Sequence, residues 1–148
     1  MENMTFEQVQ TVVKTMAKVA KDNEAYFCEL DGVMGDADFG VSLATGFQSV
    51  MDKWDTYDMS TIGSFLLGVT AAITSCTGGC SGPVWGTLFM RNGMMFKDKT
   101  ELTVTDIAAG LNSAIDGISK RGGAKLGDKT LLDALDVIAK SLEASAAG

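Results

Sequence analysis

The sequence predicts an all-α fold, an antiparallel helical bundle or barrel of about six helices. Apolar residues recur at three- and four-residue spacings in six segments, and a residue suited to a helix N-cap stands before most of them. No segment alternates apolar and polar residues as a half-buried strand does. The 148 residues, 46% of them hydrophobic, are enough to bury a core and suit one domain over residues 1–148.

The first predicted helix covers residues 5–27. Thr5 followed by Gln8 forms the pattern of a capping box, in which each side chain bonds the backbone N–H of the other residue. The second predicted helix has Ser42 as its N-cap and ends near Trp54, with apolar residues on its inner face.

The third predicted helix starts after Ser60 or Thr61, either of which suits the cap, and ends near Cys76. The fourth starts at Pro83, the only proline, because a fixed φ angle and a missing N–H suit the first helical position. It runs towards Phe96.

The fifth predicted helix is capped by Thr103 or Thr105 and runs to about Lys120. The sixth begins at Asp128 or Thr130. Its apolar residues keep helical spacing until the helix frays in a tail of Ala, Ser and Gly.

Charge and composition exclude several functions. Nineteen acidic and 12 basic residues give a net charge of −7, so no excess of positive charge would attract nucleic acid or an anionic membrane. The cleanest apolar stretch, residues 62–76, is shorter than the ~20 residues that a membrane span needs. The chain has no His, which excludes His-based triads, His zinc sites and a phosphohistidine on this chain.

The three cysteines match no familiar zinc or redox spacing, and the N-terminus lacks the basic and apolar regions of a secretory signal. A reducing cytoplasm is therefore the expected location.

Glycine is concentrated between the predicted helices. Of the 17 glycines, 11 lie in residues 32–46, 78–86 and 122–127. If these three segments lie at one end of the bundle, backbone amides and helix N-termini would face a common region suited to an anion. The alternative is that each segment is only a tight connection that needs positive φ angles.

Three carboxylates, Asp31, Asp36 and Asp38, lie within eight positions of the first segment, with no basic residue among them. Clustered carboxylates without His or thiolate ligands favour a hard cation such as Mg²⁺, Mn²⁺ or Ca²⁺. An EF-hand is excluded, because no acidic residue stands at the twelfth loop position. The alternative is solvated turn chemistry, which is common for Asp beside Gly.

The other two segments carry weaker signals. Cys80 is interpreted as a small packing residue, since no nearby base would activate it as a nucleophile. Residues 122–130 differ from a nucleotide P-loop, because an Asp precedes the Lys-Thr pair and no strand precedes the loop. Lys125 and Lys129 remain candidates to neutralise phosphate charge.

Taken together, residues 31–40, 78–86 and 121–130 resemble the nucleotide-binding, DhaL-type subunit of dihydroxyacetone kinase. The three motifs occur in the order of that family, and the resemblance extends from the first helix to about Leu142. It implies an α-helical barrel with Mg-nucleotide, ADP or ATP, bound at one end.

The resemblance also implies roles for particular residues. Asp31, Asp36 and Asp38 would ligate two Mg²⁺ ions that bridge the nucleotide phosphates. No residue of this chain is assigned as a catalytic acid, base or nucleophile. The positions that match ADP contacts of the family are Phe39, Gly40, Val41, Ser42, Cys80, Ser81, Gly122 and Leu131.

Two departures from the family stand out. Phe39 occupies a position where the family commonly has His, and the family continues beyond Gly148 with further helices and an Asp-Pro-Gly nucleotide contact. We therefore expect a barrel that is incomplete at its C-terminus. The consequence is weak nucleotide affinity, a homodimer formed through an exposed apolar face, or both.

The implied function is that of a kinase subunit. It would present a phosphoryl group to dihydroxyacetone held on a partner subunit, with a phosphohistidine protein of the phosphotransferase system recharging bound ADP. The alternatives are a related kinase subunit for another acceptor and a non-catalytic, nucleotide-sensing partner protein.

Overall fold

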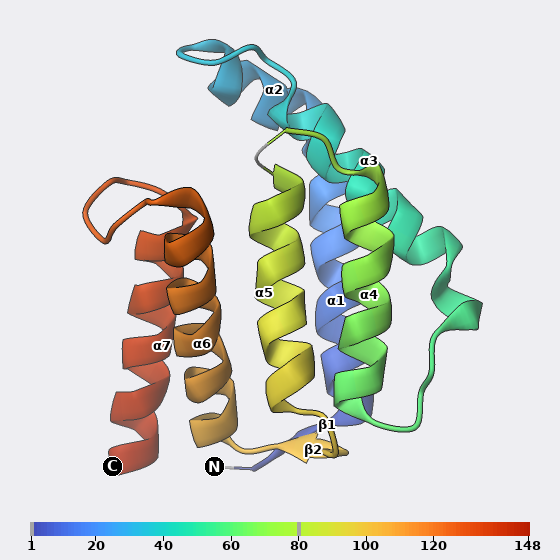
Figure 1. Ribbon diagram of the computed structural model, residues 1–148, viewed down its shortest axis with the longest axis vertical. Helices are drawn as coiled ribbons and strands as arrows, with labels where there is room; N and C mark the ends of the chain where they lie inside the picture. The colour runs from blue at the N-terminus through green and yellow to red at the C-terminus, as the bar shows by residue number, and fades with distance from the viewer. Residues whose placement is uncertain (1, 80) are drawn as a thin grey trace.

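The computed structural model describes residues 2–79 and 81–148, and Figure 1 shows its arrangement. Two two-residue strands pair with each other, and helices account for nearly all the remaining regular structure. The elements in chain order are β1 (Met4–Thr5), α1 (Phe6–Asp22), α2 (Glu24–Gly32), α3 (Phe39–Asp52), a 3₁₀ turn η1 (Trp54–Thr56), α4 (Ile62–Cys76), α5 (Ser81–Met95), β2 (Glu101–Leu102), α6 (Val104–Gly122) and α7 (Leu131–Ala147).

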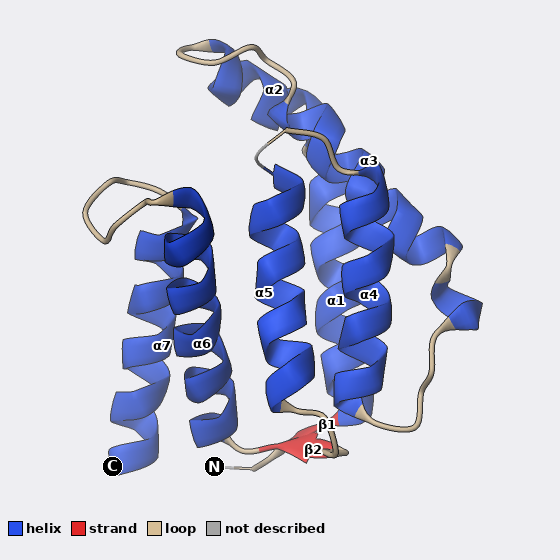
Figure 2. Ribbon diagram, viewed as in Figure 1, coloured by secondary structure: helices blue, strands red, loops and turns tan. Residues whose placement is uncertain are grey.

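The predicted all-α class is confirmed. Figure 1 shows α5 between the α6–α7 pair on one side and α1, α3 and α4 on the other, with α2 lying across one end. Strands β1 and β2 pair antiparallel at the opposite end, with Met4 facing Leu102 (Figure 2). This small sheet was not predicted, because two residues are too few to show alternation.

Local capping signals located several helix starts correctly. Thr5 and Gln8 form the predicted box at α1, and Thr61 caps α4 by accepting the N–H of Ser64. Thr103 and Thr130 cap α6 and α7, each in a box with an Asp three residues later. These caps satisfy backbone donors that a helix end leaves free.

The predicted first helix, residues 5–27, is wrong because the structure divides it in two. The side-chain amide of Asn23 donates to the carbonyl of Val19 at 2.9 Å, and its backbone leaves helical geometry with φ −111° and ψ 15°. A new helix, α2, then begins at Glu24 and continues to Gly32. The helical spacing of apolar residues continues across Asn23, so the sequence pattern gives no sign of the break.

Two further helix starts differ from the prediction. Helix α3 begins at Phe39 and not after Ser42, since a carboxylate from α2 caps it from eight residues away. Helix α5 already includes Ser81, two residues before Pro83. Proline is tolerated there because first-turn N–H groups have no partner within the helix.

Two apolar clusters hold the bundle together. The larger joins α1, α3, α4 and α5 and includes the fully buried rings of Phe47 and Phe65. The smaller joins α5, α6 and α7 around Ala114 and Leu132. At the α2 end, Phe27 and Phe39 pack against the larger cluster and Ala124 of the α6–α7 loop packs against the smaller one.

Within the residues that the structure describes, no helix is both long and apolar enough to cross a membrane.

Candidate metal and nucleotide site

The three glycine-rich segments lie at one end of the bundle, as the sequence analysis required for a shared anion site. Figure 1 shows the α2–α3 loop, the α4–α5 connection and the α6–α7 loop at the same end. The antiparallel order of the helices produces this arrangement, because α3, α5 and α7 all begin there. Their positive N-terminal ends therefore face the same region.

The three aspartates predicted as metal ligands come together in space. Asp31 lies in the last turn of α2, and Asp36 and Asp38 lie in the loop before α3. One carboxylate oxygen from each lies within 4.8 Å of the other two. All three side chains reach solvent, so the cluster is open to a cation and its phosphate ligands.

Backbone hydrogen bonds fold the loop tightly around Asp31. The N–H of Gly35 donates to the Asp31 carbonyl at 2.6 Å, and a Cβ at Gly35 would collide with the Asp31 carboxylate. Ala37 adopts a left-handed conformation with φ 62°, which reverses the chain between Asp36 and Asp38. Loop geometry thus directs the three carboxylates to one point.

The first carboxylate also caps the next helix. Oδ2 of Asp31 accepts the backbone N–H of Asp38 at 3.1 Å and of Phe39 at 3.2 Å. These bonds fix Asp31 against the start of α3. Both use Oδ2, so Oδ1 does not take part in the capping.

The pKa values of the other two carboxylates are shifted in opposite directions. A hydrogen bond between them lowers the pKa of Asp36 and raises that of Asp38. The negative charges of Asp36 and Asp31 further raise the pKa of Asp38. Mutual repulsion of this kind is relieved when a cation occupies the cluster.

The donor set therefore fits a hard divalent cation. It offers carboxylate oxygens only, in reach of one another and of solvent, with no His or thiolate ligand. Mg²⁺ keeps several non-protein oxygens in its shell, and this open cluster leaves room for them.

Backbone amides lie beside the carboxylates. By helix geometry the first-turn N–H groups of Gly40 and Val41 point out of the N-terminal end of α3. Ser42 donates its N–H to the carbonyl of Asp38 at 2.9 Å and so begins the helical bonding pattern. Ser81 stands at the start of α5, and Cys80 lies outside the described residues.

A cavity of about 350 Å³ lies between the start of α5 and the end of α6. Gly122, one of the predicted contacts, lines this cavity and has open space around it, and Leu131 begins α7 and is half-buried against the smaller core cluster. Sequence reasoning overlooked Arg121, whose Nη1 donates to Thr87 Oγ1 at 3.2 Å beside the same cavity. The sequence feature that could have identified Arg121 is its position next to Gly122, a predicted nucleotide contact.

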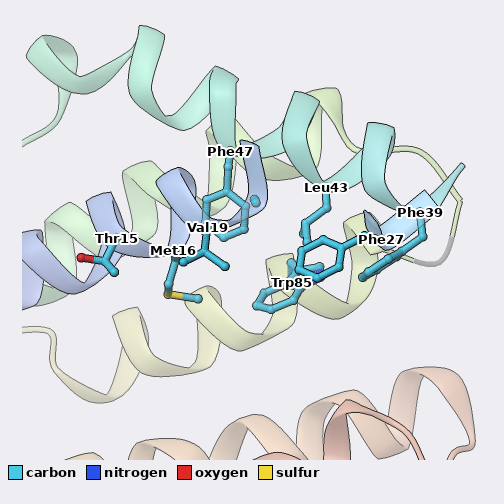
Figure 3. Close-up of a pocket in the computed structure, with 9 residues that line it drawn as sticks. Thr15, Met16, Val19, Phe27, Phe39, Leu43, Phe47 and Trp85 are labelled. Atoms are coloured by element: carbon cyan, nitrogen blue, oxygen red, sulfur yellow. The ribbon is translucent and has the colours of Figure 1, made fainter. Parts of the chain in front are cut away.

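Phe39 is oriented differently from the other predicted contacts. Its ring turns into an apolar cavity of about 300 Å³ inside the bundle, where Figure 3 shows it beside Phe27 and near Leu43 and Trp85. Its ring centroid lies 6.0 Å from that of Phe27. The side chain thus belongs to the apolar interior and not to the carboxylate cluster.

Comparison with known proteins identifies the family. The model of the DAK2 domain matches residues 33–148, which include Asp36, Asp38 and nearly all of the three glycine-rich segments; Asp31 lies two residues before the match. The chain belongs to the DAK2 domain family.

Members of known function are similar to this DAK2 chain over most of its length. The ADP-binding subunit DhaL of the PTS-dependent dihydroxyacetone kinase of Lactococcus lactis is 28% identical over 142 residues, covering 94% of this chain and 71% of that protein. The ADP-binding subunit DhaL of the PEP-dependent enzyme of Escherichia coli is 33% identical over 120 residues, covering 81% of this chain and 57% of that protein. The DhaL-type resemblance is confirmed.

A solved structure confirms the fold. The dihydroxyacetone kinase of C. freundii, crystallised with AMP-PNP and Mg²⁺, superposes with a TM-score of 0.81 at 23% identity. The match covers 97% of this DAK2 chain and 26% of that protein.

Proposed function

We propose that this chain is the Mg-nucleotide-binding subunit of a dihydroxyacetone kinase. It binds ADP or ATP at the α2 end and presents a phosphoryl group to dihydroxyacetone held by a partner subunit. The observation that carries the proposal is the meeting of Asp31, Asp36 and Asp38 within 4.8 Å beside the N-terminus of α3, in a member of the DAK2 family.

The carboxylates hold the cation side of the site. Asp36 and Asp38 present oxygens from the loop, and Asp31 presents one from α2 while its Oδ2 caps α3. When bound, Mg²⁺ supplies positive charge to the phosphate oxygens. Because the cluster is open to solvent, it also leaves room for a second cation, and we include two Mg²⁺ ions in the proposal.

The amides hold the phosphate side. Gly40 and Val41 present first-turn amides at the positive end of α3 next to the carboxylates, Ser42 follows in the same turn with its N–H bonded to Asp38, and Ser81 stands at the positive end of α5. We assign the cavity beside Gly122, with Leu131 at the start of α7, to the rest of the nucleotide. Of the nucleotide contacts predicted from the sequence, Phe39 stays in the proposal through its backbone alone, because its ring lies in the apolar cavity. Cys80 stays in the proposal on the basis of the sequence alone.

The acceptor and the phosphoryl donor chemistry lie on other proteins. This chain has no His, so in this proposal the phosphohistidine donor is a partner protein, as is the subunit that holds dihydroxyacetone. The names of the L. lactis and E. coli relatives, ADP-binding subunits of a PTS-dependent and a PEP-dependent kinase, support coupling to a phosphotransferase system. The proposal adds that the subunit is cytoplasmic and that its ADP stays bound. The homodimer expected from the sequence has no support in the comparisons and is not part of the proposal.

Phe39 favours one alternative, a nucleotide-binding partner protein without turnover. With its ring in the apolar cavity, this side chain offers no polar group to the phosphates. Turnover of dihydroxyacetone in the presence of the partner subunit separates the two functions.

Isothermal titration of ADP in the presence of Mg²⁺ tests the proposed site. Asp36→Asn removes one ligand and is expected to weaken binding by at least tenfold, about 1.4 kcal/mol or more. Asp98→Asn, an exposed carboxylate at the opposite end of the bundle, serves as the matched control and should bind as the unchanged protein does. Equal affinities for the two variants would refute the assignment of the cluster.

A further inference from the structure

Helix α2 carries the metal ligand Asp31 but is weakly attached to the bundle. None of its residues is fully buried, and among the helices it packs chiefly on α3. Segments with little buried apolar surface open locally at low free-energy cost. The position of Asp31 therefore depends on a small number of contacts between α2 and the start of α3.

Phe27 and Asp31 lie four residues apart and thus on the same face of α2. That face meets the first turn of α3. One residue of α3 contacts both: the backbone N–H of Phe39 donates to Asp31 Oδ2 at 3.2 Å, and its ring lies 6.0 Å from the ring of Phe27.

The ring of Phe39 is itself anchored. It lines the apolar cavity together with Leu43 of α3 and Trp85 of α5, as Figure 3 shows. Both Phe39 and Phe27 pack against the larger core cluster, and their rings contact each other, so the two rings together connect the bundle interior to the helix that holds Asp31.

We propose that Phe39 is a positioning residue for the metal site: its ring fixes α2, and with it Asp31, at the distance from Asp36 and Asp38 that a shared cation needs. This inference rests on the proposed metal site and deepens it. Residues that orient metal ligands without touching the metal commonly change affinity by about 10–100-fold when they are removed.

The test is Mn²⁺ binding by the full chain without nucleotide, followed by electron paramagnetic resonance. Mn²⁺ prefers the same oxygen ligands as Mg²⁺. We expect Phe39→Ala to weaken Mn²⁺ binding by about tenfold. Phe39→Leu, which keeps an apolar anchor, should recover most of the loss. Leu30→Ala, which removes an exposed side chain of the same helix, is the control and should leave Mn²⁺ affinity unchanged.

Phe27→Ala is expected to reproduce the loss, and the double variant Phe27→Ala/Phe39→Ala should lose less affinity than the sum of the two single losses, because the contact between the two rings is removed in all three. Should Phe39→Ala lose its helical circular dichroism, Phe27→Ala carries the test alone. A merely structural role would lower the melting temperature and leave the Mn²⁺ affinity of the folded protein unchanged, which would overturn the inference.

Additive losses in the double variant would also overturn it. Failure of the unchanged protein to bind Mn²⁺ would refute the proposed site, whereas equal binding by the unchanged protein and Phe39→Ala would refute only the role of Phe39.

Discussion

Gly40→Ala should destabilise the contact that seats α2 on α3. Gly40 is buried in the first turn of α3. A Cβ at this position would collide with the carbonyl oxygen of Glu24 and lie 2.8 Å from Cys28 Sγ and 2.9 Å from Cys28 N. Two of these three atoms belong to the backbone, so a rotamer change cannot relieve the overlap and α2 must move.

The magnitude follows from two opposing terms. Overpacking of this kind costs about 1–3 kcal/mol. Replacing Gly by Ala inside a helix stabilises the helix by up to about 1 kcal/mol. The net expectation is a loss of up to about 2 kcal/mol in the free energy of unfolding.

Gly122→Ala is the matched control. Gly122 is also helical, its φ angle is not positive, and nothing lies within 4 Å of a Cβ built there. This variant should gain up to about 1 kcal/mol or stay unchanged. Urea unfolding followed by circular dichroism measures both variants, and equal stability of the two would refute the close approach of α2 to α3.

Three further predictions concern local conformation and ionisation. Ala37→Gly should stabilise the protein by about 1 kcal/mol in urea unfolding, since it relieves the left-handed φ angle of 62°; a loss of stability would contradict that conformation. Tyr57→Phe should cost about 1 kcal/mol at pH 7, because it removes the 2.8 Å hydrogen bond to the carbonyl of Val50. Burial raises the pKa of Tyr57 to about 12, so its contribution is complete below the ordinary value of 10.0 and is lost as pH rises towards 12; an alkaline melting series of the Phe variant should lack this fall. Backbone hydrogen bonds from Gly127 and Thr130 lower the pKa of Asp133 below its ordinary 3.8, so its stabilisation is present above that pH and disappears as pH falls through the lowered value. Asp133→Asn should therefore have a lower melting temperature than the unchanged protein at pH 7. If the two melting temperatures still differed in strong acid, the stabilisation would not come from the ionised carboxylate of Asp133.

The parts of the fold that short-range chemistry determines were predictable. Thr5, Thr103 and Thr130 form capping boxes with a residue three positions later, so the sequence alone locates the start of α1 and narrows the starts of α6 and α7 to two candidates each. The three aspartates were also predictable as a group, because their residue type and close spacing imply one loop.

The parts that depend on contacts across the fold were not predictable in the same way. Helix α3 starts at Phe39 because Asp31 supplies its cap from another helix. The break at Asn23 depends on one side-chain hydrogen bond within an otherwise continuous apolar pattern. The direction of the Phe39 ring depends on the cavity that Phe27 and Trp85 help to enclose, and no local pattern reports a cavity.

Native mass spectrometry of the full chain with ADP and Mg²⁺ tests the central claim most directly. The account predicts that the 15.6 kDa chain gains one ADP together with metal ions. It predicts as well that Asp36→Asn/Asp38→Asn abolishes the gain, whereas Asp98→Asn keeps it. A chain whose mass stays bare at millimolar Mg-ADP would contradict the claim that the α2 end is a Mg-nucleotide site.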